Sequence, residues 1–216
     1  MASPVPRPAE GFDFCPSEHE QPEVEEFHGT PRFDLLDLLF AFLSSPDELN
    51  PVLCGYFQKL VFVFQRRHSA KLLAYVYANS AVINNMLKHI GSKSVADVLV
   101  RLITTDEGVL ISGDPQNAAQ LYTALQATRA HVVAQLVAMI LRQPESEQHE
   151  ETFDEEEARI NACNVLTELC EDENFSRALC ENEAVLLQLC GGVKHKKTIS
   201  GVAHVLRALL RSAGPK

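Results

Sequence analysis

Apolar residues recur at every third or fourth position from Phe33 onward, which is the period of helices with one buried face. The first such stripe comprises Phe33, Leu36, Leu39, Phe40 and Leu43. Glycine and proline fall almost only between such segments, and no strand-like alternation is visible. Residues 1–30 are rich in Pro, Glu and Ser without an apolar period. The pattern predicts an all-α domain over residues 31–216 and a disordered acidic tail over residues 1–30.

Three segments of the predicted domain resemble one another. They are "NSAVINNML" from Asn79, "TRAHVVAQL" from Thr128 and "NEAVLLQLC" from Asn182, with starts 49 and 54 residues apart. Each opens with a residue type that caps helices and has alanine two positions later. Units of this length with two or three helices are typical of armadillo- or HEAT-like stacks, the α-solenoids. Chance similarity among apolar helices remains the alternative.

The turn "KHIG", Lys88 to Gly91, is predicted to end one of these helices. A glycine at this place adopts the left-handed conformation at little cost. Lys88 and His89 then lie in the last helical turn, where positive charge meets the negative end of the helix dipole. This local role accounts for His89 without a catalytic or metal-binding function.

The next helix is predicted to open at "SVAD", Ser94 to Asp97, which has the form of a capping box. Asp97 and Arg101 lie four residues apart. On a helix this spacing brings two side chains together, so we expect an ion pair between them.

The net charge of −10 is unevenly distributed. The first thirty residues carry seven acids and one base, and residues 144–157 carry eight acids without Lys or Arg. The remaining residues hold 14 acids and 18 bases. We therefore expect a solvated acidic loop at 144–157 and a faintly basic domain around it. Because no basic stripe with interleaved aromatics occurs, nucleic acid is not an expected partner.

The chain shows no secretory leader, and its apolar runs "KLVFVF" and "LLAYVYA" are too short to cross a bilayer. We expect no membrane partner, a cytoplasmic location with the nucleus as a second compartment, and six reduced cysteines.

No motif for chemistry stands out, so we predict neither an enzyme nor a cofactor. The strongest metal candidate comprises Cys163, Cys170, Cys180, Cys190 and His195, but it lacks the close ligand pairs of zinc sites. Cys163 and Cys170 are seven residues apart, a spacing typical of a buried helix face. A Cys–His nucleophile would need a base and an oxyanion site, and the sequence locates neither.

Basic residues near predicted helix ends and turns are the candidate contact points for an acidic partner surface. One cluster lies in "VKHKKTIS", Val193 to Ser200, for which a merely solvated loop is the alternative. The predicted partner-binding residues are Lys88, His89, Lys93, Arg101, Lys194, Lys196 and Lys197.

Two signatures resemble the SAPS-domain family of protein phosphatase regulators. The stretch "LLDLLFAFLSSPDELNPVLCGYFQKLVFVF" contains "LNP" at Leu49 to Pro51, and "MLKHIGSKSVADVLVRLI" contains "KHIG". The family's leucine-rich continuation is matched by Asp97, Leu99, Arg101 and Leu102. "INACNVLTEL", Ile160 to Leu169, is similar to a later family helix. The resemblance covers Phe33 to Leu210.

The resemblance implies a non-catalytic, helical-repeat scaffold that binds the catalytic subunit of a phosphatase 6-type Ser/Thr phosphatase and directs its substrate choice. Ankyrin-repeat subunits join such complexes in the family. An acidic tail stands where family members have further helices, and the sequence ends where members continue, which indicates a fragment or a short divergent relative. The alternative function is a general helical-repeat adaptor for another partner.

Overall fold

A computed structural model describes residues 34–105, 108, 118–142 and 152–213. All regular secondary structure in these ranges is helical, which confirms the all-α prediction. Residue contacts divide the chain into two units, Met1–Arg32 and Phe33–Lys216. The predicted tail, residues 1–30, and most of the predicted acidic loop lie outside the described residues.

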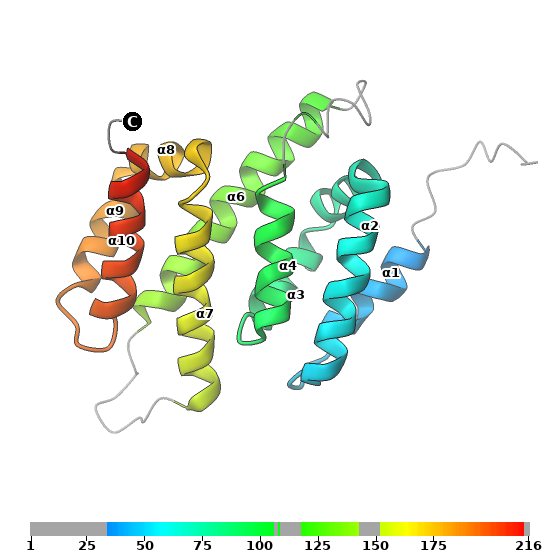
Figure 1. Cartoon of the computed structure of the whole chain (residues 1–216), viewed down its shortest axis with the longest axis horizontal. Helices are drawn as coiled ribbons and strands as arrows, with labels where there is room; N and C mark the ends of the chain where they lie inside the picture. Colours follow the sequence, from blue (N-terminus) through cyan, green and yellow to red (C-terminus); the bar gives the residue numbers. More distant parts are fainter. Residues whose placement is uncertain (1–33, 106–107, 109–117, 143–151, 214–216) are drawn as a thin grey trace, which may run out of the picture. The chain divides into compact units, whose positions relative to one another are not determined.

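The helices of the second unit form two rows, in which each helix contacts the next (Figure 1). The first row contains α2 (Pro51–Ala78), α4 (Lys93–Ile103), α7 (Phe153–Leu169) and α10 (Ile199–Ala213). The second row contains α3 (Ser80–Lys88), α6 (Ala118–Leu141) and α9 (Glu183–Gly192). The shorter elements are α1 (Asp34–Ala41), the 3-10 helix η1 (Phe42–Ser44) and α8 (Glu173–Glu181).

The three similar segments all lie in the second row, in α3, the later half of α6 and α9. Their predicted common cap is only partly present. The side chain of Asn182 accepts from the Val185 amide at 3.2 Å, whereas Asn79 precedes α3 without a side-chain cap bond. Thr128 lies inside α6, so the cap predicted there is wrong. The residues of α6 that precede Thr128, 118–127, contain neither glycine nor proline, and the helix therefore continues through Thr128.

The long helix α2 begins with a cap and bends near its middle. The Asn50 side chain accepts from the amides of Val52 and Leu53 at 2.9 and 3.3 Å, and Pro51 occupies the first turn. His68 has non-helical angles, φ −140° and ψ 43°. The kink at His68 thus divides α2 into two helical segments.

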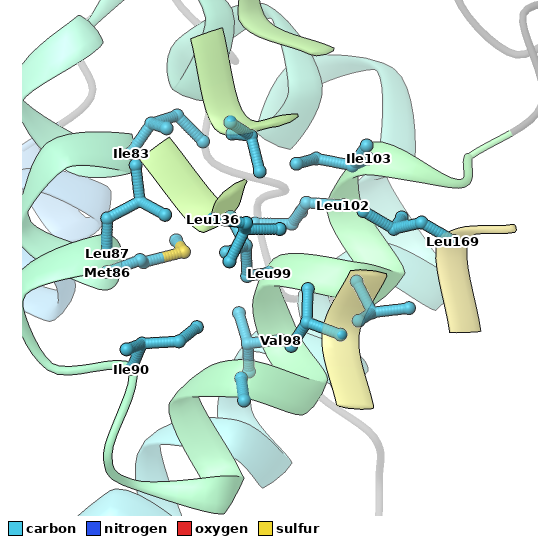
Figure 2. Close-up of a cluster of buried hydrophobic side chains, with 14 of the residues drawn as sticks. Ile83, Met86, Leu87, Ile90, Val98, Leu99, Leu102, Ile103, Leu136 and Leu169 are labelled. Carbon is cyan, nitrogen blue, oxygen red and sulfur yellow. The ribbon is translucent and has the colours of Figure 1, made fainter. Parts of the chain in front are cut away.

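The core lies between the two rows, and Figure 2 shows its middle. Leu99 of α4 and Leu136 of α6 are completely buried and lie together at the centre of this view. Around them are Ile83, Met86 and Leu87 of α3, Leu102 and Ile103 of α4, and Leu169 of α7. Removal of this apolar surface from water supplies the main driving force for folding.

Among the described residues, α6 is the one helix long and apolar enough to cross a membrane, a property that core helices share. Six of its side chains are buried, and it packs against α2, α3, α7 and α9. One side of α6 therefore belongs to the core.

The acidic loop predicted over residues 144–157 ends earlier than expected. Helix α7 begins at Phe153, after a capping box in which Thr152 and Glu155 bond to each other's backbone amides. Asp154, Glu155 and Glu156 therefore occupy the first helical turn, where negative charge stabilises the positive end of the helix dipole. The prediction of a loop is wrong for residues 153–157.

Candidate functional site

The three sequence motifs that carry the family resemblance meet in one groove. This groove, called the KHIG groove below, has a volume of about 650 Å³. Its floor and walls come from the segment before α2, the α3–α4 turn and the first half of α7. The motif residues that line it are Leu49 and Pro51 from "LNP", Lys88, His89 and Gly91 from "KHIG", and Asn161 from "INACNVLTEL".

Lys88 and His89 hold the backbone segment that precedes α2. The Lys88 ammonium donates to the carbonyl oxygens of Ser45 and Pro46 at 3.0 and 3.3 Å. His89 Nε2 lies 3.2 Å from the same Ser45 oxygen and donates to it when Nε2 carries the proton. These bonds cross more than forty residues of sequence. Both side chains are thus engaged in joining two segments of the fold.

Asn161 of α7 fixes the α3–α4 turn from the other side. Its side-chain amide donates to the carbonyl oxygens of Ile90 and Gly91 at 3.1 and 2.7 Å. Gly91 does not have a positive φ, so the predicted left-handed conformation is wrong. A Cβ at Gly91 would meet its nearest atoms at an ordinary 3.9 Å. The turn needs no left-handed residue because Asn161 satisfies its free carbonyls.

Helix α4 begins one residue before the predicted capping box. Lys93 is its first residue, and Ser92, which precedes it, makes no side-chain cap bond. Ser94 to Asp97 already lie inside the helix. The capping-box prediction is therefore wrong at this position.

The ion pair predicted between Asp97 and Arg101 is wrong, because each side chain has other partners. Asp97 accepts from Gln58 of α2 at 2.9 Å and from Lys93 at 3.3 Å. The Arg101 guanidinium donates to the Gln65 side chain of α2 at 3.2 Å. Both polar residues thus join α4 to α2 because glutamines of α2 face them.

The KHIG groove carries both signs of charge. Its basic residues Lys88, His89 and Lys93 face the same space as four carboxylates, those of Asp47, Glu48, Asp154 and Glu157. Two of these acids belong to the segment that the sequence pattern assigned to a separate loop. An acidic partner would therefore meet repulsion here, which argues against the groove as its docking point.

The second basic cluster lies in the α9–α10 turn and is open to solvent. Lys194, Lys196 and Lys197 are exposed there. Arg159 of α7 anchors the turn by donating to the Lys197 carbonyl oxygen at 2.8 Å. Helix α7 thus bonds to both basic turns, through Asn161 and Arg159, and Figure 1 shows both turns at the lower end of the view.

The seven predicted partner-binding residues consequently fall into three places. Lys88, His89 and Lys93 line the KHIG groove, Arg101 lies at the contact of α2 with α4, and the other three form the α9–α10 turn. Sequence reasoning missed Asn161. Its signal was an asparagine in a helix interior, where this residue is unfavourable unless its amide has a partner elsewhere.

The candidate metal ligands do not assemble. Cys163 and Cys170 are buried, Cys180 is half-buried and Cys190 is exposed. Desolvation raises the pKa of the Cys170 thiol to about 12, and it also raises the pKa of Cys163. No group of three or more potential ligands occurs within the described ranges. Both buried cysteines occupy the core positions that their spacing predicts.

Comparison with known proteins gives a consistent family. The family model described as "SIT4 phosphatase-associated protein" (SAPS) matches residues 63–188. Serine/threonine-protein phosphatase 6 regulatory subunit 3-B of Xenopus laevis is 24% identical over 194 residues. Regulatory subunit 1 of the mouse phosphatase is 27% identical over 128 residues, and its regulatory subunit 2 is 33% identical over 88 residues.

These alignments cover 84%, 59% and 41% of this chain but only 21%, 14% and 9% of the respective relatives. The chain thus spans about a fifth or less of their length. No solved structure matches.

Proposed function

This chain belongs to the SIT4 phosphatase-associated protein (SAPS) family, and on that premise we propose that it is a non-catalytic regulatory subunit of a serine/threonine phosphatase of the phosphatase 6 type. The match over residues 63–188 carries the proposal, because it includes the "KHIG" turn and the α7 helix that fixes it. The printed names of the relatives supply the phosphatase class.

We further propose that the helices form an armadillo/HEAT-like stack. Two observations support this arrangement. The contacts run from helix to next helix along two rows, and the three similar sequence segments all fall in the second row. Such a stack presents a long surface rather than an enclosed pocket, which suits a protein that positions a catalytic subunit.

The proposed docking point for the catalytic subunit is the α9–α10 turn. Lys194 and Lys196 are exposed there, in contrast with the mixed charges of the KHIG groove. In the proposal, an acidic surface of the catalytic subunit docks on this turn. The rest of the stack is left to select substrates and to receive ankyrin-repeat subunits.

The test is direct binding between the purified chain and an immobilised phosphatase 6 catalytic subunit, measured over a range of salt concentrations. We expect saturable binding whose association rate falls with added salt, because opposite charges steer the encounter. The chain alone should release no phosphate from a phosphopeptide. A catalytic subunit from another class of Ser/Thr phosphatase is the control. Absence of binding, or equal binding to the control, would contradict the proposal and favour an adaptor for another partner.

A further inference from the structure

The outer face of α2 before its kink is a second surface with a chemistry of its own. Val52, Tyr56 and Leu60 are 65%, 58% and 50% exposed, although each is a large apolar or aromatic side chain. At 100° per residue they fall on one side of the helix, together with Val63. Cys54, Phe57 and Val61 form the opposite, buried side.

Three cations lie on the same exposed side: Lys59 lies among the apolar residues, and Arg66 with Arg67 continues the stripe beyond Val63. Lys59, Arg66 and Arg67 fall within about 120° of arc together with the apolar residues. Lys59 places its ammonium 5.8 Å from the centre of the Tyr56 ring. The whole of α2, Pro51–Ala78, contains no aspartate or glutamate. Among the described residues, no carboxylate forms an ion pair with Arg66 or Arg67.

We propose that this face of α2, called the α2 stripe, docks an amphipathic helix of a partner protein whose apolar residues are followed or preceded by acidic ones. The apolar part of the α2 stripe would pack against the partner's apolar side, and the cations at its far end would pair with the acids. The α2 stripe runs from residue 52 to residue 67, about 22 Å along the axis, so the matching segment has about four helical turns. Recognition of this kind uses side chains spaced three and four residues apart.

Charge distinguishes an acidic partner helix from two alternative occupants, a second copy of this chain and a membrane surface. In a symmetric pair of copies, an antiparallel crossing would set the cations of one α2 stripe on the apolar half of the other. A parallel crossing would set cation against cation, which is also unfavourable. In helices that lie in a membrane interface, the cations form a polar face beside the apolar one. Arg66 and Arg67 instead extend the line of Val52, Tyr56 and Val63.

The inference goes beyond the proposed function, because the α2 stripe shares no residue with the α9–α10 turn. The partner is defined by its chemistry and need not be the phosphatase. A failed docking of an acidic helix would leave the phosphatase-binding experiment unaffected, and the converse holds as well.

The test uses the full chain and labelled synthetic peptides of about 18 residues, long enough to cover the α2 stripe. Two peptides carry leucines at spacings of three and four in one half and glutamates in the other half. The leucine half comes first in one peptide and second in the other. A third peptide replaces each glutamate by lysine, and a fourth is a scrambled version. Binding is followed by fluorescence anisotropy at low and at moderate salt. We expect one of the two acidic peptides to bind, more weakly as salt rises, and the lysine and scrambled peptides to fail.

Matched variants locate the binding. Leu60→Asp with Val63→Asp should weaken the binding of the acidic peptide by more than about tenfold. Arg66→Glu with Arg67→Glu should weaken it by about tenfold and flatten its salt dependence. The controls are Leu210→Asp, at a side chain 75% exposed on α10, and Arg207→Glu with Arg211→Glu on the same helix. Both should leave the affinity within about twofold. Circular dichroism should give each variant the melting temperature of the parent.

Four results would overturn the inference. They are failure of both acidic peptides, equal binding of the lysine peptide, unchanged affinity in folded α2 variants, and equal losses in the α10 controls. Sedimentation and flotation with anionic vesicles test the other occupants. Self-association or vesicle binding that Leu60→Asp with Val63→Asp removes would reassign the α2 stripe to a second copy or to a membrane.

Discussion

The α3–α4 turn and the α9–α10 turn are similar in sequence, since both combine glycine with lysine and histidine, yet the structure gives these residues opposite roles. In the first turn, Lys88 binds backbone carbonyls and Gly91 has room around it. In the second, Lys194 is exposed, and Gly192 lies against neighbouring side chains. The role of a basic turn therefore depends on which segments pack around it and cannot be assigned from its residue types.

The difference has a structural cause. The first turn lies between the segment before α2 and the first half of α7. Carbonyl oxygens of the segment before α2 accept from Lys88, and the Asn161 amide of α7 donates to the carbonyl oxygens of the turn itself. The second turn contacts α7 through the bond that Arg159 donates to its backbone, and its lysines are exposed. Stability should thus depend on the first turn's polar side chains and on the second turn's glycine.

The largest effect on stability is expected at Gly192. A Cβ at this position would lie 2.3 Å from Leu141 Cδ2 and 3.0 Å from Val202 Cγ2. Gly192→Ala should lower the free energy of unfolding by about 2 kcal/mol, the usual cost of overpacking. Gly91→Ala should change it by less than about 0.5 kcal/mol, because the added methyl group has room. Urea denaturation measures both values.

A second variant tests the mechanism at Gly192. If the cost arises from the clash with the flexible Leu141 side chain, Leu141→Ala in the same chain should cost less than the sum of the two single changes. Equal losses at Gly192 and Gly91 would remove the distinction between the two turns.

Asn161→Ala should have the next largest effect. It leaves the carbonyl oxygens of Ile90 and Gly91 without their amide donor, which should cost about 1–2 kcal/mol. Asn164 is exposed on the same helix, and Asn164→Ala is the matched control, expected within about 0.5 kcal/mol of the parent. Thermal unfolding followed by circular dichroism separates the two. An equal effect of both changes would show that the bond from Asn161 to the turn contributes no stability of its own.

The bonds from Asn161 to the α3–α4 turn also show which features can be predicted from the sequence and which cannot. Apolar periodicity predicts the helices well, because each helix must bury one face, and Leu36, Phe40 and Leu43 are buried as their spacing indicates. For the same reason, the sequence could indicate that the three segments, which all lie in the second row, resemble one another. The conformation of the α3–α4 turn could not be predicted, because its carbonyl partner Asn161 lies about seventy residues away in sequence. Local capping rules predict a left-handed glycine here, whereas in the structure a distant side chain satisfies the carbonyl oxygens of the turn.

The candidate site shows the same limit. The motifs identified the residues that meet in the KHIG groove, but the sequence could not show that Lys88 and His89 point to the Ser45 carbonyl. It also separated Asp154 and Glu157 from the groove they line, because an acidic run resembles a solvated loop until a capping box turns its end into a helix.

Charge reversal at the second turn should alter binding without altering stability. Lys194→Glu with Lys196→Glu should slow association with the phosphatase 6 catalytic subunit about tenfold, equivalent to about 1.4 kcal/mol. Lys93→Glu in the first turn is the comparison, and we expect it to change the association rate little because Lys93 lies among carboxylates. Stopped-flow association at two salt concentrations distinguishes them. A larger effect of Lys93→Glu would move the docking point to the KHIG groove.

The smallest losses of stability are expected at Lys88 and Lys93, the two lysines that line the KHIG groove. Lys88→Met keeps most of the aliphatic chain but removes the donor to the Ser45 and Pro46 carbonyls, at a cost of about 0.5–1 kcal/mol. Lys93→Met breaks an exposed ion pair with Asp97 and should cost about 0.3 kcal/mol. The two losses should differ in salt dependence, because added salt screens an ion pair between exposed groups more than a bond to a backbone dipole. Urea titrations at low and high salt should therefore preserve the Lys88→Met loss and reduce the Lys93→Met loss. A Lys88→Met loss that disappears in high salt would mean that Lys88 acts through the groove carboxylates and not by holding the segment before α2.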